Sequence, residues 1–455
     1  MDLRPIFEPK TMAVFGVSAS NYHHPANEVF NKNQHRYPVT VYGINPGRET
    51  IGGQKIHHSI ADIPERIDLA IIAVRADLVP DVLSECIKAN ARSAVIISGG
   101  FKEVGRQDLQ NRIVAIAREA SFPFIGPNCL GIYVPDHVDT FFLPSERTIK
   151  PLKGNISFVS QSGGILVDQM IKFTADGVGL AKAISIGNKA LIGEIDLLDY
   201  FSTDPSTDVI AFYIEGFGEN EGRQFVLKAE KCGKPVIVIK SGKSPGGSRA
   251  VVSHTASLAG DYANFSAALA QHGVIEATSE RELISFCESL SEYPTKHIEG
   301  RVGIITVSGG HGAMTVDACA SHGIAVPSLS EQKQEEIRKN LNPSARAIAA
   351  LSNPIDLTGS GVDDDFVTTA RTLLAMDDID SIIALLLPYI PGITSDLGAK
   401  LSLIAREYNK PLIAYVPNVE KYEMLIEGFE LNGVAVSPSI EGAVLMIEAL
   451  RRNKP

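Results

Sequence analysis

Two segments, GNISFVSQSGG at residues 154–164 and GRVGIITVSGG at residues 300–310, follow the same pattern. In each, an apolar run ends in a hydroxyl residue, and after one further residue comes Ser-Gly-Gly. The apolar run predicts a buried strand, and the glycine pair predicts a tight turn before a helix. Such strand–turn–helix units, when repeated, build a parallel sheet that is covered by helices.

The two segments begin 146 residues apart, at positions 154 and 300, which is about the size of one domain. An ungapped match at this distance predicts two duplicated units. Two unrelated turns with the same steric needs remain an alternative. Duplication is favoured because each segment opens its own series of strands.

Outward from these segments, short apolar runs alternate with longer amphipathic segments along almost the whole chain. This alternation predicts the α/β class, organised as three doubly wound units. A linker at 144–154 and a break at 294–300 separate them, and 455 residues suit about three domains. The expected domains are residues 1–145, 152–294 and 300–455.

The composition narrows the class of protein. Forty-two Lys and Arg against 53 Asp and Glu give a net charge of −11, and no basic run indicates a nucleic-acid or anionic membrane surface. The N-terminus lacks an apolar signal core, and the longest apolar stretch, 381–390, is too short for a membrane span. We therefore expect no membrane and no nucleic acid as partners.

Cysteine and histidine positions exclude further classes. The five cysteines, Cys86, Cys129, Cys232, Cys287 and Cys319, are odd in number and at least 32 positions apart, so they predict neither a disulfide framework nor a zinc site. A reducing cytoplasm is expected. The adjacent pairs His23, His24 and His57, His58 lack further ligands at metal spacing, so no metal is expected.

The first predicted strand ends in AVFGVSAS at residues 13–20, a turn before a probable helix. Nucleotide phosphates bind at such turns, because free helix N–H groups and the positive end of the helix dipole meet there. An anionic cofactor is therefore expected. The fingerprint G-x-G-x-x-G is absent after Gly16, which disfavours a nicotinamide cofactor. A glycine needed only for the turn remains the alternative.

The two Ser-Gly-Gly turns are candidate phosphate sites. They comprise Ser162, Gly163 and Gly164 in one segment and Ser308, Gly309 and Gly310 in the other. Glycines let backbone N–H groups approach a phosphoryl group, and the serine hydroxyl can cap the helix or bind the anion. Equivalent turns on two units predict one phosphate shared between them.

The stretch IKSGKSPGGSRAVVSHTASLAGD at residues 239–261 leads through small residues to His254. Such a loop suits movement, which predicts His254 on a mobile arm. An imidazole can act as a nucleophile and carry a phosphoryl group. Glu215, at the end of a predicted strand, could fix its tautomer and stabilise the imidazolium. A core or surface histidine and a solvated glutamate are the alternatives.

Together these motifs resemble the NDP-forming acyl-CoA synthetases, relatives of succinyl-CoA synthetase, and among them the α subunits of ADP-forming acetyl-CoA synthetase. The resemblance covers nearly the whole chain. It is carried by AVFGVSAS, VIISGGFKEVG, GPNCLGIYVP, FVSQSGG, SIGNKALIGEIDLLDYF, YIEGF, SHTASLAGD, TVSGGHGAM and SNPIDLTG.

The resemblance implies a CoA-binding Rossmann-like domain followed by two flavodoxin-like domains. It also implies that His254 is phosphorylated, that Glu215 orients it, and that the Ser162 and Ser308 turns bind phosphate. Cys129 would lie near the reacting thioester. Coenzyme A would lie along Gly16, Ser18, Ser20, Asn45, Val74, Ser98, Gly99 and Asn128.

The implied reaction converts acyl-CoA, ADP and phosphate reversibly into a carboxylic acid, CoA and ATP. Because the sequence ends at Pro455 without an ATP-grasp domain, a separate β subunit is implied, in an α2β2 assembly with ADP or ATP and Mg on that partner. The alternative is a non-catalytic CoA-binding regulatory scaffold, which the retained His254 loop disfavours.

Three departures from the family pattern stand out. HHPANEV replaces an early Lys-x-Gly, Arg75 replaces a proline, and Leu191 replaces an acidic residue.

Overall fold

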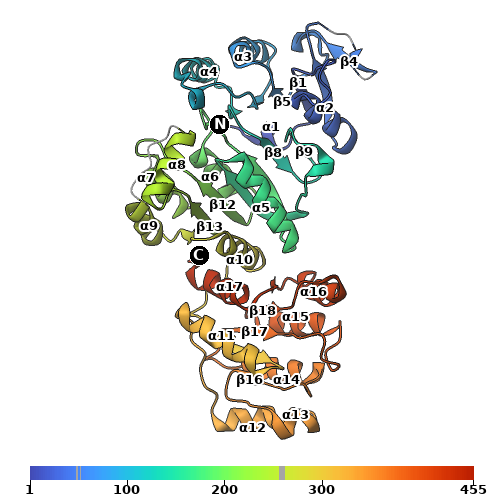
Figure 1. Ribbon diagram of the computed structural model, residues 1–455, viewed down its shortest axis with the longest axis vertical. Coiled ribbons are helices and arrows are strands. Elements are labelled where there is room, and N and C mark those ends of the chain that lie inside the picture. The colour runs from blue at the N-terminus through green and yellow to red at the C-terminus, as the bar shows by residue number, and fades with distance from the viewer. Residues whose placement is uncertain (48–49, 52, 256–261, 455) are drawn as a thin grey trace. The chain divides into compact units, whose positions relative to one another are not determined.

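The computed structural model describes residues 1–47, 50–51, 53–255 and 262–454, and the side chains of residues 252–255 lie outside the description. The chain groups into two compact units, Met1–Glu276 and Ala277–Pro455, which are described separately below (Figure 1). The predicted α/β class with three sheets is confirmed. The division into three domains stays a prediction. No described helix has both the length and the apolar character that crossing a membrane requires.

The first sheet, in Met1–Glu276, has the strand order β3-β4-β2-β1-β5-β6-β7 and is parallel except for the β3–β4 pair. Its central strands are buried along their whole length, because both faces are covered by helices. The strands are β1 (Thr11–Phe15), β2 (Thr40–Ile44), β3 (Thr50–Ile51), β4 (Gln54–His57), β5 (Leu69–Ile72), β6 (Ser93–Ile96) and β7 (Phe124–Ile125). The helices are α1 (Arg4–Phe7), α2 (Pro25–Arg36), α3 (Val79–Lys88) and α4 (Gln107–Glu119).

The second sheet has the order β14-β13-β12-β10-β11-β8-β9. Its strands are β8 (Gly131–Val134), β9 (Val138–Asp139), β10 (Lys153–Ser160), β11 (Leu180–Ser185), β12 (Val209–Ile214), β13 (Val236–Lys240) and β14 (Ile275–Ala277). Helices α5 (Gly163–Ala175), α6 (Glu194–Thr203), α7 (Glu221–Ala229), α8 (Pro245–Thr255) and α9 (Tyr262–Gln271) surround them (Figure 1). Strand β8 pairs antiparallel with β11, so a segment that follows the first sheet in sequence extends the second.

The third sheet, in Ala277–Pro455, is parallel with the order β16-β15-β17-β18-β19. The strands are β15 (Val302–Thr306), β16 (Ile355–Asp356), β17 (Ser381–Leu385), β18 (Leu412–Tyr415) and β19 (Val436–Ser437). The helices are α10 (Glu280–Glu292), α11 (Gly309–Ser321), α12 (Glu331–Asn340), α13 (Pro343–Ile348), α14 (Asp363–Leu374), α15 (Leu397–Tyr408), α16 (Glu423–Glu430) and α17 (Ile440–Arg452). Helix α10 packs on α17, where the Ser289 hydroxyl donates to the Met446 carbonyl at 2.9 Å.

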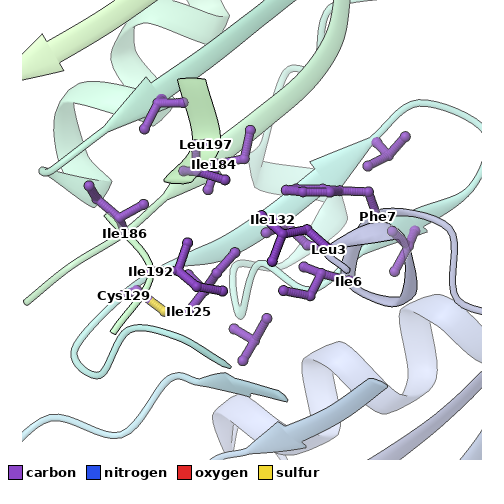
Figure 2. Packing of buried hydrophobic residues seen from close by; sticks show 14 of the residues in the cluster. Leu3, Ile6, Phe7, Ile125, Cys129, Ile132, Ile184, Ile186, Ile192 and Leu197 are labelled. Atoms are coloured by element: carbon purple, nitrogen blue, oxygen red, sulfur yellow. The ribbon is translucent and has the colours of Figure 1, made fainter. Parts of the chain in front are cut away.

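One continuous apolar core joins the first and second sheets. Figure 2 shows Leu3, Ile6 and Phe7 lying beside Ile132 of β8. Phe7 is fully buried, and its ring stacks on that of Tyr200 in α6 with 5.0 Å between centroids. The first helix therefore fills the space between the two sheets and holds them as one body.

A buried charge cluster adds a second link between the two sheets. The fully buried carboxylate of Asp139 in β9 pairs with Lys32 of α2 at 3.0 Å and also with Lys150. The Lys32 ammonium donates in addition to the Phe141 carbonyl at 2.6 Å. Burial lowers the pKa of Lys32 to about 7.

Replacing Phe7 by alanine should lower the free energy of unfolding of Met1–Glu276 by about 3 to 5 kcal/mol, because it leaves a cavity between the two sheets. Leu152→Ala is the matched control, since Leu152 is 83% exposed and its truncation should cost less than about 0.5 kcal/mol. Chemical denaturation followed by circular dichroism measures both. Equal stability of the two variants would contradict the joined core.

Candidate functional site

The residues expected to line a CoA site lie along one edge of the first sheet. Each follows the carboxyl end of a parallel strand, where ligands bind in open α/β sheets. In strand order they are Asn45 after β2, Gly16, Ser18 and Ser20 after β1, Val74 after β5, Ser98 and Gly99 after β6, and Asn128 after β7. The structure thus places these eight residues in one row.

Hydrogen bonds connect neighbouring members of this row. The Asn45 side-chain amide donates to the Val17 carbonyl at 2.7 Å. The Ser98 hydroxyl accepts from the Val74 N–H at 3.1 Å and donates to the Val74 carbonyl at 2.6 Å. The Asn128 N–H donates to the Ser98 carbonyl at 2.9 Å. These bonds therefore hold the segments after the strands in fixed positions along this edge of the first sheet.

Gly16 lies where the chain after β1 closely approaches the chain after β5. Its φ is +98°, and a Cβ atom there would lie 2.3 Å from the Ala73 carbonyl oxygen. Both the left-handed backbone and the lack of space require glycine.

Helix α2 departs from the family pattern at its N-terminus. The His24 side chain caps it, since Nδ1 accepts from the Ala26 N–H at 3.2 Å. Burial lowers the pKa of His24, which keeps Nδ1 free to accept. The Asn27 side chain accepts from the Ser18 N–H at 2.7 Å and donates to the Ser18 carbonyl. Protein groups thus occupy donors that a phosphate could otherwise use.

The other two departures lie elsewhere. Arg75 is exposed at the start of a short helical turn. Leu191 packs half-buried against the apolar core beside the first sheet. Neither lines the cavity described next.

A cavity of about 980 Å³ lies within Met1–Glu276. The Ser162, Gly163 and Gly164 turn lines it together with Asn128, the last of the eight residues in the CoA row, and with Cys129. Further lining comes from the loop 187–190, from residues of the segment 217–221, from side chains of α4 and from apolar residues such as Leu130, Phe142 and Val167. The structure therefore brings together the predicted phosphate turn and part of the predicted CoA row.

The Ser162 turn is the N-terminus of α5. The Ser162 hydroxyl accepts from the Ile165 N–H at 3.4 Å, a long cap. A Cβ on Gly164 would find only the Ser162 hydroxyl, at 4.0 Å. The start of the helix is thus open to the cavity and can receive an anion through its N–H groups and dipole.

Cys129 cannot supply a thiolate at neutral pH. Its side chain is buried, and Sγ donates to the Ile96 carbonyl at 3.3 Å. Burial raises the pKa of this thiol to about 12.

Glu215 follows β12 directly and is 5% exposed. The Gln161 side chain holds its backbone: Oε1 accepts from the Glu215 N–H at 2.6 Å and from the Gly216 N–H at 3.0 Å. Nε2 of Gln161 donates to the Gly216 carbonyl at 2.8 Å. Ser162 is the residue after Gln161, so the bonds of Gln161 connect Glu215 rigidly to the phosphate turn.

Lys189 strengthens this connection. Its ammonium donates to Glu194 at 3.0 Å, to the Gly216 carbonyl at 3.0 Å and to Glu221 at 3.2 Å. Three donors thus meet three protein acceptors. Lys189 lines the cavity with a backbone φ of +44°, and its role is to hold the loop after Glu215 in place.

His254 belongs to α8, and its side chain lies outside the described residues. The predicted contact between His254 and Glu215 therefore stays a prediction.

The Ser308, Gly309 and Gly310 turn begins α11 in Ala277–Pro455. Here the Ser308 hydroxyl lies 3.0 Å from Nδ1 of His311 and does not cap the helix. The first N–H groups of α11 receive no side-chain cap and can donate hydrogen bonds to an anion. The phosphate shared with the Ser162 turn stays a prediction, because it requires a defined arrangement of the two units.

The sequence analysis missed Gln161, Lys189 and Glu194. All three lie in quoted motifs, and the available signal was that Gln161 directly follows β10 and that Lys189 lies in the loop after β11. Within the described parts of the chain, no group of three His, Cys, Asp or Glu side chains could hold a metal ion.

Known families match the chain in three consecutive stretches. A CoA binding domain matches residues 10–135, a succinyl-CoA ligase like flavodoxin domain matches 153–290, and a Ligase-CoA domain matches 302–418. A solved structure of dinucleotide forming acetyl-coenzyme A synthetase 1 from Ca. Korarchaeum cryptofilum, in complex with phosphate and ADP, is similar at a TM-score of 0.87 and 30% identity. That match covers 99% of this chain and 97% of the other.

Curated relatives are similar over most of the chain. The α subunit of acetate–CoA ligase [ADP-forming] II from Pyrococcus furiosus is 34% identical over 94% of this chain and 93% of its own length. Acetate–CoA ligase [ADP-forming] I from Archaeoglobus fulgidus is 38% identical over 84% of this chain and 54% of its own length. The chain thus spans about half the length of the Archaeoglobus relative and of a relative from Methanocaldococcus jannaschii, where the share is 49%.

Gly16→Ala should weaken CoA binding at least about tenfold, because a Cβ forces the turn away from Ala73. Gly105→Ala is the matched control: Gly105 also has a left-handed backbone, with φ of +81°, but no atom within 4 Å of its Cβ position. Isothermal calorimetry with CoA compares the two. Tight binding by Gly16→Ala would contradict a ligand site at this edge.

Proposed function

Because the chain belongs to the family of the ADP-forming acetate–CoA ligases, we propose that it is the subunit of such a ligase that carries the acyl and phosphoryl transfers. The net reaction converts acyl-CoA, phosphate and ADP reversibly into a carboxylic acid, CoA and ATP. The observation that carries the proposal is the cavity in Met1–Glu276, where the Ser162 turn lies beside the end of the CoA row.

In the first step, a phosphate oxygen attacks the thioester carbonyl carbon. The C–S bond breaks, CoA leaves as thiolate or thiol, and acyl phosphate forms. The open N-terminus of α5 supports this step, because its N–H groups and dipole can stabilise the charge of phosphate. Protonated Cys129 takes no covalent part.

In the second step, an unprotonated ring nitrogen of His254 attacks phosphorus. The bond between phosphorus and the acyl oxygen breaks, and the carboxylic acid leaves as its anion. The imidazole becomes cationic, and the carboxylate of Glu215 holds the proton on its second nitrogen. The clamp formed by Gln161 supports this role, because it fixes Glu215 beside the phosphate turn.

Phosphohistidine then passes its phosphoryl group to ADP. The partner is proposed to be an ATP-grasp β subunit in an α2β2 assembly, with the nucleotide and Mg bound on that partner. The α-subunit name of the Pyrococcus furiosus relatives supports a partner. A cytoplasmic location is proposed because the five cysteines form no disulfide. The substrate class is a small carboxylic acid and its CoA thioester.

His254→Ala should abolish phosphorylation of the chain by acyl-CoA and phosphate, because the nucleophile is lost. Glu215→Gln should slow labelling by roughly 10²- to 10⁴-fold while CoA affinity is retained, since the orienting charge is gone. The label is measured as acid-labile, base-stable radioactive phosphate. Undiminished labelling of His254→Ala would contradict the phosphohistidine. Normal CoA binding with no labelling of the wild-type protein would favour the regulatory scaffold.

We further propose that the Ser308 turn binds the same phosphate as the Ser162 turn. Gly164→Val and Gly310→Val should then each reduce phosphate-dependent cleavage of acyl-CoA by about 10- to 100-fold. The branched side chain would keep phosphate away from one backbone N–H, so one charge-assisted hydrogen bond would be lost. Both sites have space for a Cβ, with the nearest atom at 4.0 Å. Gly163 and Gly309 are poorer sites, because a Cβ there would meet Leu130 and Asp356 at 3.1 Å.

Gly193→Val is the matched control for these substitutions. Gly193 begins α6 with open space around it and does not line the cavity. The cleavage of acyl-CoA is measured by the free thiol that it releases. An effect of Gly164→Val without an effect of Gly310→Val would disprove the shared site and leave the first turn as the phosphate site.

A further inference from the structure

Lys240 is a buried cation for which the proposed reaction has no use so far. It is the last residue of β13 and is 5% exposed. Its ammonium donates to the backbone carbonyl of Glu215 at 2.6 Å and to the Ser241 carbonyl. It forms no salt bridge with a carboxylate among the described residues, so two neutral oxygens are its direct acceptors.

The charged groups around Glu215 come from several elements. Burial raises the pKa of Tyr213 in β12, and the neighbouring Glu215 charge adds to the rise. Lys240 from β13 interacts with the Glu215 charge, and Lys243 follows in the next loop. Lys189 donates to the Gly216 carbonyl and pairs with Glu194 and Glu221. His254 lies on α8, with its side chain outside the described residues.

Lys189 and Lys240 differ in how their charges are compensated. Lys189 forms salt bridges with both Glu194 and Glu221, at 3.0 and 3.2 Å, so two carboxylates already compensate its charge. Burial alone would favour the protonated, neutral form of Glu215. A cation held against the same residue favours the ionised form. The fixed bond from Lys240 to the Glu215 carbonyl keeps this cation in place.

We propose that Lys240 is a positioning residue that keeps Glu215 ionised and thereby ready to hold the imidazolium of His254. The inference rests on the proposed function. Lys240 also ties the end of β12 to the end of β13, where the chain enters the loop that leads to α8. A second hydrogen bond, from the Ser241 N–H to the Ile214 carbonyl at 3.0 Å, also fixes the start of this loop.

The test is the pH dependence of His254 phosphorylation in the full chain with acyl-CoA and phosphate. Labelling requires ionised Glu215 and an unprotonated His254, so the acid limb of its rate depends on both groups, and the carboxyl titration described below isolates the part due to Glu215. Lys240→Gln removes the charge and keeps a hydrogen-bond donor, so the acid limb should move to higher pH by about 1 to 3 units. Lys240→Arg keeps the charge and should retain the wild-type limb.

Lys243→Gln is the matched control, because it removes a positive charge three residues away. The Lys243 ammonium lies over the Tyr262 ring, 5.7 Å from its centroid. The acid limb of Lys243→Gln should stay within about 0.3 units of wild type, because solvent screens the half-exposed Lys243 more strongly than the buried Lys240. A shift as large as that of Lys240→Gln would overturn the inference.

A second readout is independent of activity. With ¹³C at the glutamate side-chain carboxyls, the Glu215 signal is identified by its loss in Glu215→Gln, and its titration should move upward in Lys240→Gln. An unchanged titration would overturn the inference even if labelling were slower. An upward shift without any labelling of wild-type protein would instead support the charge role of Lys240 and contradict the proposed phosphohistidine.

Discussion

The side-chain amide of Gln161 holds the two sides of the candidate site at a fixed spacing. Its oxygen accepts two N–H groups of the chain after β12, and its nitrogen donates to the Gly216 carbonyl. Gln161 follows β10, the strand that leads into the phosphate turn. Its side-chain amide fixes the backbone of Glu215, which follows β12. An acid or base can act on a bound phosphate only if the distance between them is constant. The sheet places the ends of β10 and β12 side by side, and this amide fixes the distance between the residues that follow them.

Electrostatic compensation completes that arrangement. Lys189 is neutralised by two carboxylates, whereas Lys240 is held by two carbonyls beside Glu215. The half-buried Lys189 and the buried Lys240 therefore have different roles at one site. The first fixes a loop, and the second supplies a charge.

Strand periodicity allowed much of this fold to be predicted, because buried parallel strands are continuous apolar runs. The runs at 12–17 and 69–74 correspond to β1 and β5, and the repeated turns begin α5 and α11. Site residues at strand ends were predictable for the same reason. The bonds of Gln161 to residues 54 positions away, the pairing of β8 with β11 and the packing of α10 on α17 were not predictable. They depend on tertiary contacts that leave no local pattern. The His24 cap was likewise hidden, since a histidine is an uncommon cap.

The apolar core that Leu3, Ile6 and Phe7 share with β8 has a thermodynamic consequence. Two sheets with one core unfold together, so any molecule that binds the native form of one half stabilises the other half by the same amount. A ligand bound at the row of strand ends would then also make local opening around the Ser162 turn slower. Such coupling needs no hinge and no second conformation. In this body, the ligand itself acts as part of the scaffold.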